Sequence, residues 1–195
     1  MQIDVLVELI EDLPDKQLKT SRDPYTGVLV VNAIAKKQRD VPYHWVYISK
    51  SKTGFYRIGY YSNVSKMFLP TELRDSHIVA VYIEKAFRFD REPTNLDIVA
   101  YRMLEEAQEY GFIGEVIGFD YDFVRIAYTW RRPDSSWPEI VKSFLEQYPI
   151  IAVGRYATWG EVEGISESIH DALTCLLYTS PSPRDLSTSR MPSSA

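Results

Sequence analysis

The chain has 195 residues, a net charge of −5 and 45% hydrophobic residues, the balance of a soluble globular chain with a sizeable core. It shows no basic stripe, no apolar run near the roughly 20 residues of a membrane span and no export signal, which predicts a cytoplasmic protein without a nucleic-acid partner. One cysteine and three histidines without ligand spacing predict neither disulfides nor a metal site.

The first expected element is a helix over residues 5–12, which ends before a proline. Four strands are expected next, at residues 25–37, 42–49, 55–63 and 76–87. The turn-like sequence "KSKTG" separates the second and third of these strands, so we expect them to pair as a hairpin.

A helix over residues 94–111 follows, with Thr94 as its expected N-cap and Gly111 as its C-cap. The remaining expected elements are a strand at 116–130, a helix at 135–148, a short strand at 150–156 and a helix at 165–173. Hairpin-spaced strands followed by helices predict an α+β fold, with an antiparallel or mixed sheet and flanking helices. We expect residues 1–149 to form this sheet and its helices, and residues 150–174 to add a closing strand and helix.

The composition changes at Cys175 to Ser, Thr, Pro and Arg without a hydrophobic period, as in a disordered tail. The segments "CLLYTSPSPRD" and "SRMPSSA" also resemble, in one reading frame, the translation of a widely used transposase-type sequencing adapter. We therefore expect residues 175–195 to be artefactual, and the natural sequence to break off inside the last helix.

The stretch "VGRYATWGEVEGISESI", residues 153–169, carries the clearest functional signal. Gly154 ends the predicted strand without a side chain, so a ligand could approach the backbone there. Arg155 is a fork-shaped donor, and Gly164 opens a helix whose first N–H groups favour anionic or carbonyl oxygens. A plain strand–loop–helix connection with an exposed arginine is the alternative.

The same stretch resembles the closing FAD-binding motif of the flavin-containing amine-oxidase superfamily, in the branch of UDP-galactopyranose mutases and protoporphyrinogen-oxidase-like proteins. Residues 42–49 and 54–70 similarly resemble that branch's substrate-domain strands. Ala157 and the segment 160–162 depart from the pattern. The resemblance implies FAD as cofactor, contacted by Gly154, Arg155, Trp159, Gly164, Ile165 and Ser166.

No G-x-G-x-x-G follows a strand in this sequence, although the superfamily opens with that dinucleotide-binding motif. The resemblance therefore implies a C-terminal fragment, inactive without its N-terminal FAD-binding domain. The implied chemistry is hydride transfer between flavin and a small-molecule substrate, or covalent work by reduced flavin in a mutase-like relative.

Aromatic side chains and one cation gather on the second and third expected strands, and we expect Trp45, Tyr56, Arg57 and Tyr61 to contact the substrate. Strict alternation would place Phe55, Arg57 and Gly59 on one face, and Tyr56 and Ile58 on the other. Arg57 could then hold an acidic group or diphosphate. Two alternatives stay open: the aromatics simply pack on the sheet, or the chain is a non-enzymatic α+β binding module.

Overall fold

The computed structural model describes residues 22–74, 77–91, 93–148, 150, 152–159 and 164–179, so the helix expected over residues 5–12 lies outside the described residues. The chain divides into two compact units. One, the sheet unit, is Tyr25–Tyr128, and the other, the helical unit, combines Met1–Pro24 with Thr129–Ala195. The boundary between the units falls between residues 128 and 129. The helix expected at residues 135–148 therefore belongs to the helical unit, whereas the sequence analysis grouped it with the sheet.

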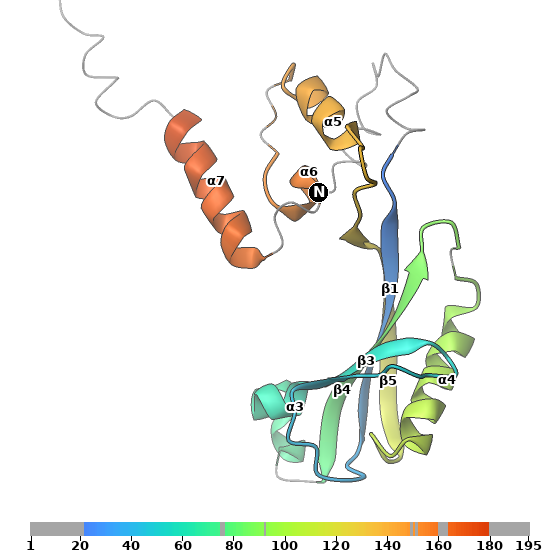
Figure 1. The fold of residues 1–195 in the computed structure, drawn as a ribbon. Helices are drawn as coiled ribbons and strands as arrows, with labels where there is room; N and C mark the ends of the chain where they lie inside the picture. The colour runs from blue at the N-terminus through green and yellow to red at the C-terminus, as the bar shows by residue number, and fades with distance from the viewer. Residues whose placement is uncertain are drawn as a thin grey trace, which may run out of the picture. The chain divides into compact units, whose positions relative to one another are not determined.

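A five-stranded sheet with the order β2-β3-β4-β1-β5 forms the sheet unit (Figure 1). Its strands are β1 (Tyr25–Lys36), β2 (Trp45–Tyr47), β3 (Phe55–Tyr60), β4 (Ile78–Arg88) and β5 (Val116–Thr129). β2 with β3, β3 with β4, and β4 with β1 pair in antiparallel fashion. β5 lies beside β1 and runs in the opposite direction. At the end of β1, the N–H of Lys36 donates to the carbonyl of Glu115, which directly precedes β5, at 2.8 Å. The predicted α+β class and the hairpin are confirmed.

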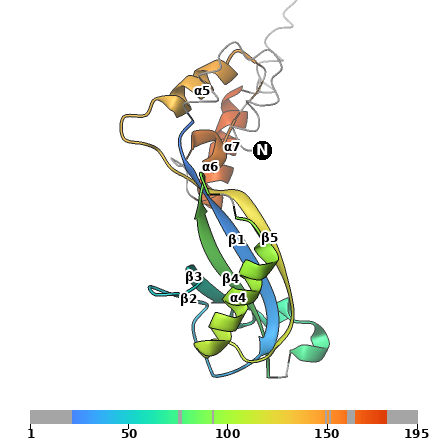
Figure 2. The same cartoon turned by 90° about the vertical axis from the view of Figure 1, so that its right-hand side faces the viewer.

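Helix α4 (Leu96–Glu109) covers one face of this sheet (Figures 1 and 2). Because side chains alternate along a strand, every second residue from Leu29 to Ala35 of β1 and from Val79 to Ile83 of β4 points to α4 and is buried. The main contributors to this core are Leu29, Val31, Ala33, Ala35, Val79, Val81 and Ile83 of the strands, and Ala100, Met103, Leu104 and Ala107 of α4. We call the side of the sheet away from α4 the open face.

The third strand ends earlier than the sequence predicts. β3 stops at Tyr60, and residues 61–64 form the short helix α3 (Tyr61–Val64), followed by the 3-10 turns η1 (Lys66–Phe68) and η2 (Thr71–Leu73). The Asn63 amide explains the turn, because it donates to the carbonyls of Val41 at 2.6 Å and Tyr43 at 2.8 Å. These bonds draw the chain back towards the segment before β2.

The ends of α4 also differ in detail from expectation. The N-cap is Asn95, in a left-handed conformation with φ 55° and without a side-chain cap, so the prediction of Thr94 is wrong. At the other end Tyr110 occupies the C-cap, and Gly111 follows it with φ 69°. Gly111 thus ends the helix as a left-handed residue one position after the cap, which is where glycine is favoured.

A carboxylate of α4 fixes the loop that joins β2 to β3. Glu106 is buried and accepts hydrogen bonds from the N–H groups of Lys52 (2.5 Å) and Thr53 (2.8 Å), and from the hydroxyls of Thr53 (2.6 Å) and Ser51 (3.0 Å). Burial opposes ionisation, but these bonds outweigh it and lower the pKa of Glu106 to about 2. The hairpin is therefore held against α4 by an ionised side chain.

The helical unit contains α5 (Trp137–Leu145), α6 (Arg155–Thr158) and α7 (Ile165–Thr179). Pro138 lies in the first turn of α5, as predicted. The strand expected at 150–156 is wrong: the described residues before Gly154 are irregular and α6 follows it. A strand needs a hydrogen-bonded neighbour, and no described strand pairs with this segment. α7 continues through residues 175–179, where a structureless tail was expected.

Candidate functional site

A largely buried ion pair lies on the open face. Arg57 of β3 donates to Glu84 of β4 through Nε at 2.9 Å and through its NH2 group at 2.7 Å, which is a bidentate arrangement. The side chains are 22% and 10% exposed. The hydroxyl of Tyr56 donates to the same carboxylate at 2.5 Å. Both oxygens of Glu84 are therefore engaged by its neighbours on the sheet.

A β-bulge places Tyr56 and Arg57 together. The register of β3 against β4 shifts between Phe55, which faces Lys85, and Arg57, which faces Glu84. The extra residue interrupts the alternation, so Tyr56 and Arg57 both reach Glu84, whereas Phe55 and Ile58 are both buried in the core. The predicted division of β3 between two faces is therefore wrong, because strict alternation does not allow for a bulge.

The guanidinium of Arg57 is surrounded by tyrosine rings. Its Cζ lies 5.8 Å from the ring centroid of Tyr47, 5.7 Å from that of Tyr56 and 5.8 Å from that of Tyr82. Burial opposes the charge, but the bonds to Glu84 and Tyr47 raise the pKa of Arg57. Burial and the bond to Glu84 likewise raise the pKa of Tyr56. The pair therefore consists of a permanent cation and a carboxylate that largely neutralises it.

A row of aromatic rings continues from the ion pair across the open face. The rings of Tyr82 and Tyr61 lie 4.9 Å apart, and Tyr61 stacks on Phe68 at 5.2 Å and 27°. The hydroxyl of Tyr61 donates to the side-chain carbonyl of Asn32 at 3.1 Å. A Cβ at Gly59 would lie 2.1 Å from the ring of Tyr82, so glycine is what allows this ring to lie on β3.

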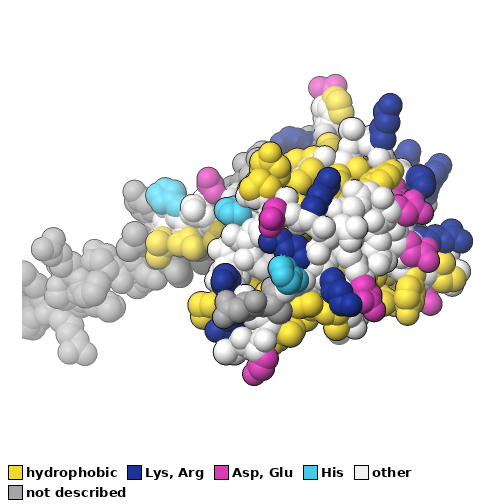
Figure 3. All heavy atoms as spheres, turned by 90° about the horizontal axis from the view of Figure 1, so that it is seen from below, with side chains coloured by type: hydrophobic (Ala, Val, Ile, Leu, Met, Phe, Trp, Pro, Cys, Tyr) yellow, Lys and Arg dark blue, Asp and Glu magenta, His cyan; other side chains and the backbone are white. Residues whose placement is uncertain are grey.

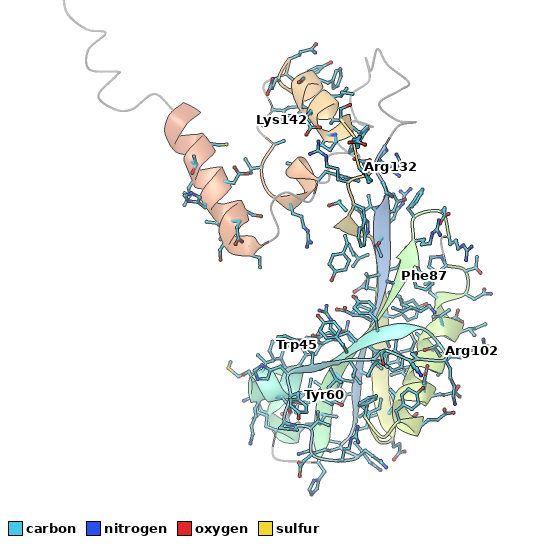
Figure 4. All side chains as sticks on the ribbon, viewed as in Figure 1. Trp45, Tyr60, Phe87, Arg102, Arg132 and Lys142 are labelled. Carbon is cyan, nitrogen blue, oxygen red and sulfur yellow. The ribbon has the colours of Figure 1, made fainter. Side chains whose placement is uncertain are left out.

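Trp45 reaches the open face from β2. It pairs with Gly59, whereas its neighbour Val46 pairs with Ile58 and packs against the core. Alternation therefore directs Trp45 away from α4, and Figure 4 shows it on the side of the sheet opposite Arg102 of α4. The indole is 51% exposed, so much of its surface is open to solvent.

All four predicted substrate residues thus lie on one face of the sheet unit. The sequence reasoning missed their partners on β1 and β4, which are Asn32, Tyr82 and Glu84. A signal for two of them was present: β4 alternates Val79, Val81 and Ile83 with Ala80, Tyr82 and Glu84. The polar members of that pattern occupy the open face.

The predicted cofactor residues lie in the helical unit. Gly154 has φ 82° and is buried, and its N–H donates to Asp171 of α7 at 3.1 Å. A Cβ at this position would lie 3.1 Å from the hydroxyl of Ser168, so the close approach that requires glycine is made by α7. Arg155 begins α6 and does not end a strand.

The first turn of α7 presents Gly164, Ile165 and Ser166. Ile165 is 81% exposed, and Ser166 is also exposed. The hydroxyl of Ser168 donates to the carbonyl of Gly164 at 2.9 Å and holds the start of the helix. The first N–H groups of a helix have no partner within it, and the helix dipole makes this end partly positive. The carboxylate of Glu167 lies beside Gly164 at this turn, so an electron-rich ligand edge could use these N–H groups only after displacing it.

Trp159 has a different environment from these residues. It is 1% exposed, lies 4.9 Å from Trp137 in an edge-to-face contact, and donates from its indole to the carbonyl of Trp130 at 3.2 Å. Its φ of 53° is left-handed. Its ring and its donor are both engaged within the helical unit, so Trp159 fits the core of that unit better than a cofactor contact.

Charged residues elsewhere on the surface are mixed in sign. Figure 3 shows lysines, arginines and carboxylates interspersed with hydrophobic side chains on the face that it displays. Asp120 of β5 accepts from the N–H of Tyr121 at 2.9 Å.

The described residues bring together no group of three or more side chains suited to a metal ion. No helix in the described ranges has both the length and the apolar character needed to cross a membrane.

Comparisons with known proteins identify the fold but not the family. No protein-family model matches the chain, and no curated protein matches its sequence. Reduced UDP-galactopyranose mutase matches 82% of the chain with a TM-score of 0.61 at 14% identity. A protein of Exiguobacterium assigned as a protoporphyrinogen oxidase matches 91% with a TM-score of 0.60 at 12% identity. The chain spans 35% and 39% of the lengths of these two structures.

Proposed function

We propose that this chain is the C-terminal part of an FAD-dependent oxidoreductase of the amine-oxidase or mutase-like kind. The observation that carries the proposal is the fold, since 82% of the chain matches a UDP-galactopyranose mutase and 91% matches a protein assigned as a protoporphyrinogen oxidase. A shared fold alone does not establish an activity. The resemblance of residues 153–169 to a closing flavin motif supports the same conclusion independently.

In this proposal the open face of the sheet binds the substrate. Its rings and hydroxyls provide stacking surface and a few directed polar groups, which is the composition of a small-molecule site. Arg57 positions the rings of Tyr47, Tyr56 and Tyr82, and Glu84 holds Arg57 in place. The side chains orient a ligand and reduce its contact with water, without a nucleophile–base pair of their own.

The exposed turn formed by Gly164, Ile165 and Ser166 would hold the pyrimidine edge of FAD, and Gly154 and Arg155 would lie along the cofactor. Hydride exchange with the substrate is the chemistry that FAD supplies when bound. The N-terminus of α7 would stabilise negative charge at that edge. The dinucleotide half of the cofactor requires the N-terminal domain, and residues 175–195 would be adapter sequence that replaces the natural continuation.

The experiment is to recover the genomic locus, express the complete gene and record the visible absorbance of its product. A yellow protein with flavin bands is expected. Arg155→Ala and Gly164→Ala should weaken flavin retention, whereas Lys142→Ala of α5 serves as a control that should not. A complete gene without a dinucleotide domain, whose product stays colourless with added FAD, would rule the proposal out.

A binding module without catalysis is the second candidate. The observation in its favour is that the open-face cluster is built within the sheet unit, from Asn32, Trp45, Tyr47, Tyr56, Arg57, Tyr61, Tyr82 and Glu84. Such a surface could bind a carbohydrate or a partner without any flavin. Ligand binding by a colourless complete protein would favour this candidate.

A further inference from the structure

A groove lies beside the aromatic row on the open face and has a volume of about 520 Å³. This is within the range of small-molecule sites, which is roughly 300–1,000 Å³. We call it the Asn32 groove. Its lining includes Asn32, Tyr61, Phe68, Ala80, Gly118 and Asp120.

Small side chains leave the groove open, and aromatic rings form one wall. A Cβ at Gly118 would meet no atom within 4 Å, so the backbone of β5 borders free space there. Tyr61 and Phe68 stack on each other along the other side, at 5.2 Å. A flat or ring-shaped ligand could therefore lie against this wall with its apolar face.

Hydrogen-bond acceptors predominate among the polar side-chain groups of the groove, and the Nδ2 group of Asn32 is a donor beside them. Asn32 offers the carbonyl oxygen that already accepts from Tyr61, and Asp120 offers a carboxylate. Among the described residues that line the groove, Asp120 alone carries a formal charge. A ligand that donates hydrogen bonds suits these acceptors, whereas an anion would be repelled by Asp120.

Arg57, on the same face, does not change this balance. Arg57 is bound through two of its nitrogens to Glu84, and its NH1 group lies 3.4 Å from the hydroxyl of Tyr47. An anionic ligand would have to compete with Glu84 for the guanidinium. The sequence-based expectation that Arg57 holds an acidic group or diphosphate is therefore not favoured by its surroundings.

We infer that the Asn32 groove binds an uncharged ring carrying hydroxyl or N–H donors, and that it discriminates against ligands bearing a phosphate or diphosphate. The inference deepens the proposed function, because it gives the ligand class of the same face. Sugars and planar heterocycles both have the required chemistry, so the test includes one matched pair for each. The flavin pair serves here as a probe of planar rings, because the proposed function places the cofactor itself at the turn formed by Gly164, Ile165 and Ser166.

The first pair is riboflavin and riboflavin 5′-phosphate, which share one ring system and differ by a phosphate. The second is methyl α-D-galactopyranoside and α-D-galactose 1-phosphate. Each ligand is titrated into the chain at constant ionic strength, and binding is followed by saturation-transfer NMR. The neutral member of at least one pair should bind at least tenfold more tightly than its phosphorylated partner, and the pair that does so identifies the ring.

Two variants connect the preference to the groove. Asp120→Asn should reduce the discrimination severalfold and keep neutral binding, while Asp122→Asn removes the same charge two residues away on β5 and should change little. Gly118→Leu should fill the groove and abolish binding, with folding checked by circular dichroism.

Equal or tighter binding of the phosphorylated ligands, no binding of any ligand, or identical effects of Asp120→Asn and Asp122→Asn would overturn the inference. Its failure is distinguishable from failure of the proposed function, which is decided by flavin absorbance of the complete protein. A yellow protein without the neutral preference would contradict the inference alone. A colourless protein with that preference would contradict the flavoenzyme alone.

Discussion

In the sheet unit, the candidate site is assembled from four strands, with Asn32 on β1, Tyr47 on β2, Arg57 on β3 and Glu84 on β4. In the helical unit, the predicted cofactor residues lie along one stretch of chain, 154–166. Paired strands fix the first set by a shared hydrogen-bond register, whereas capping contacts and tryptophan packing fix the second. A sheet therefore brings together residues that are distant in the sequence. If this difference holds, the sheet unit should depend on contacts between strands and the helical unit on the packing of its tryptophans.

Trp159→Ala should cause the largest loss, about 4 kcal/mol of unfolding free energy, because it removes a fully buried indole and leaves a cavity. Hydrogen exchange of the α5 amides measures it, and the rates should rise strongly. Trp45→Ala is the matched control, since its side chain is half exposed. A comparable loss from both substitutions would contradict the packing role assigned to Trp159.

Arg57→Ala should cost about 3 kcal/mol, since it leaves the carboxylate of Glu84 buried without its main partner. Urea unfolding followed by circular dichroism measures the loss. The double variant Arg57→Met with Glu84→Leu should recover much of it, because it removes both charges and retains apolar volume. If the double variant is less stable than Arg57→Ala, desolvation of Glu84 is not the cause.

Glu106→Gln should cost about 2 kcal/mol at neutral pH, because four donors of the loop lose an ionised acceptor. The pKa of Glu106 is lowered to about 2 in the folded chain, from a usual value of 4.5. Its contribution is therefore complete above pH 4.5 and is lost as the pH falls towards 2.

Urea midpoints measured across this pH range test the role of Glu106. The difference between the wild type and Glu106→Gln should narrow as the pH falls. Glu105→Gln, on the exposed neighbour, is the control and should follow the wild type. A difference that stays constant with pH would show that the charge of Glu106 does not hold the loop.

Gly59→Ala should have the smallest effect of the four, about 1–2 kcal/mol, because the new methyl group would displace the ring of Tyr82. Gly118→Ala introduces the same methyl group on β5, where it meets no atom within 4 Å, and should change stability by less than about 0.5 kcal/mol. Thermal melting of both variants gives the comparison. Equal melting temperatures would mean that the ring of Tyr82 moves without cost.

The spacing of hydrophobic residues predicted β1, β4, β5 and α4 of the sheet unit, because this spacing shows which face of a strand or helix is buried. Val79, Val81 and Ile83 predict a strand wherever its partner lies. The apolar segment before Gly154 shows the limit, since such a segment becomes a strand only beside another one. The ion pair was beyond pattern reasoning, because it depends on the pairing of β3 with β4.

The bulge in β3 affects how any relative can be compared with this chain. Residues before it and after it are out of phase by one position, so a gapless alignment to a strand without the bulge is correct for only one half. In the other half, side chains of the ligand-facing side would be matched to side chains of the interior. Transfer of function from a homologue should therefore begin by asking whether its strand carries the same additional residue between Phe55 and Arg57.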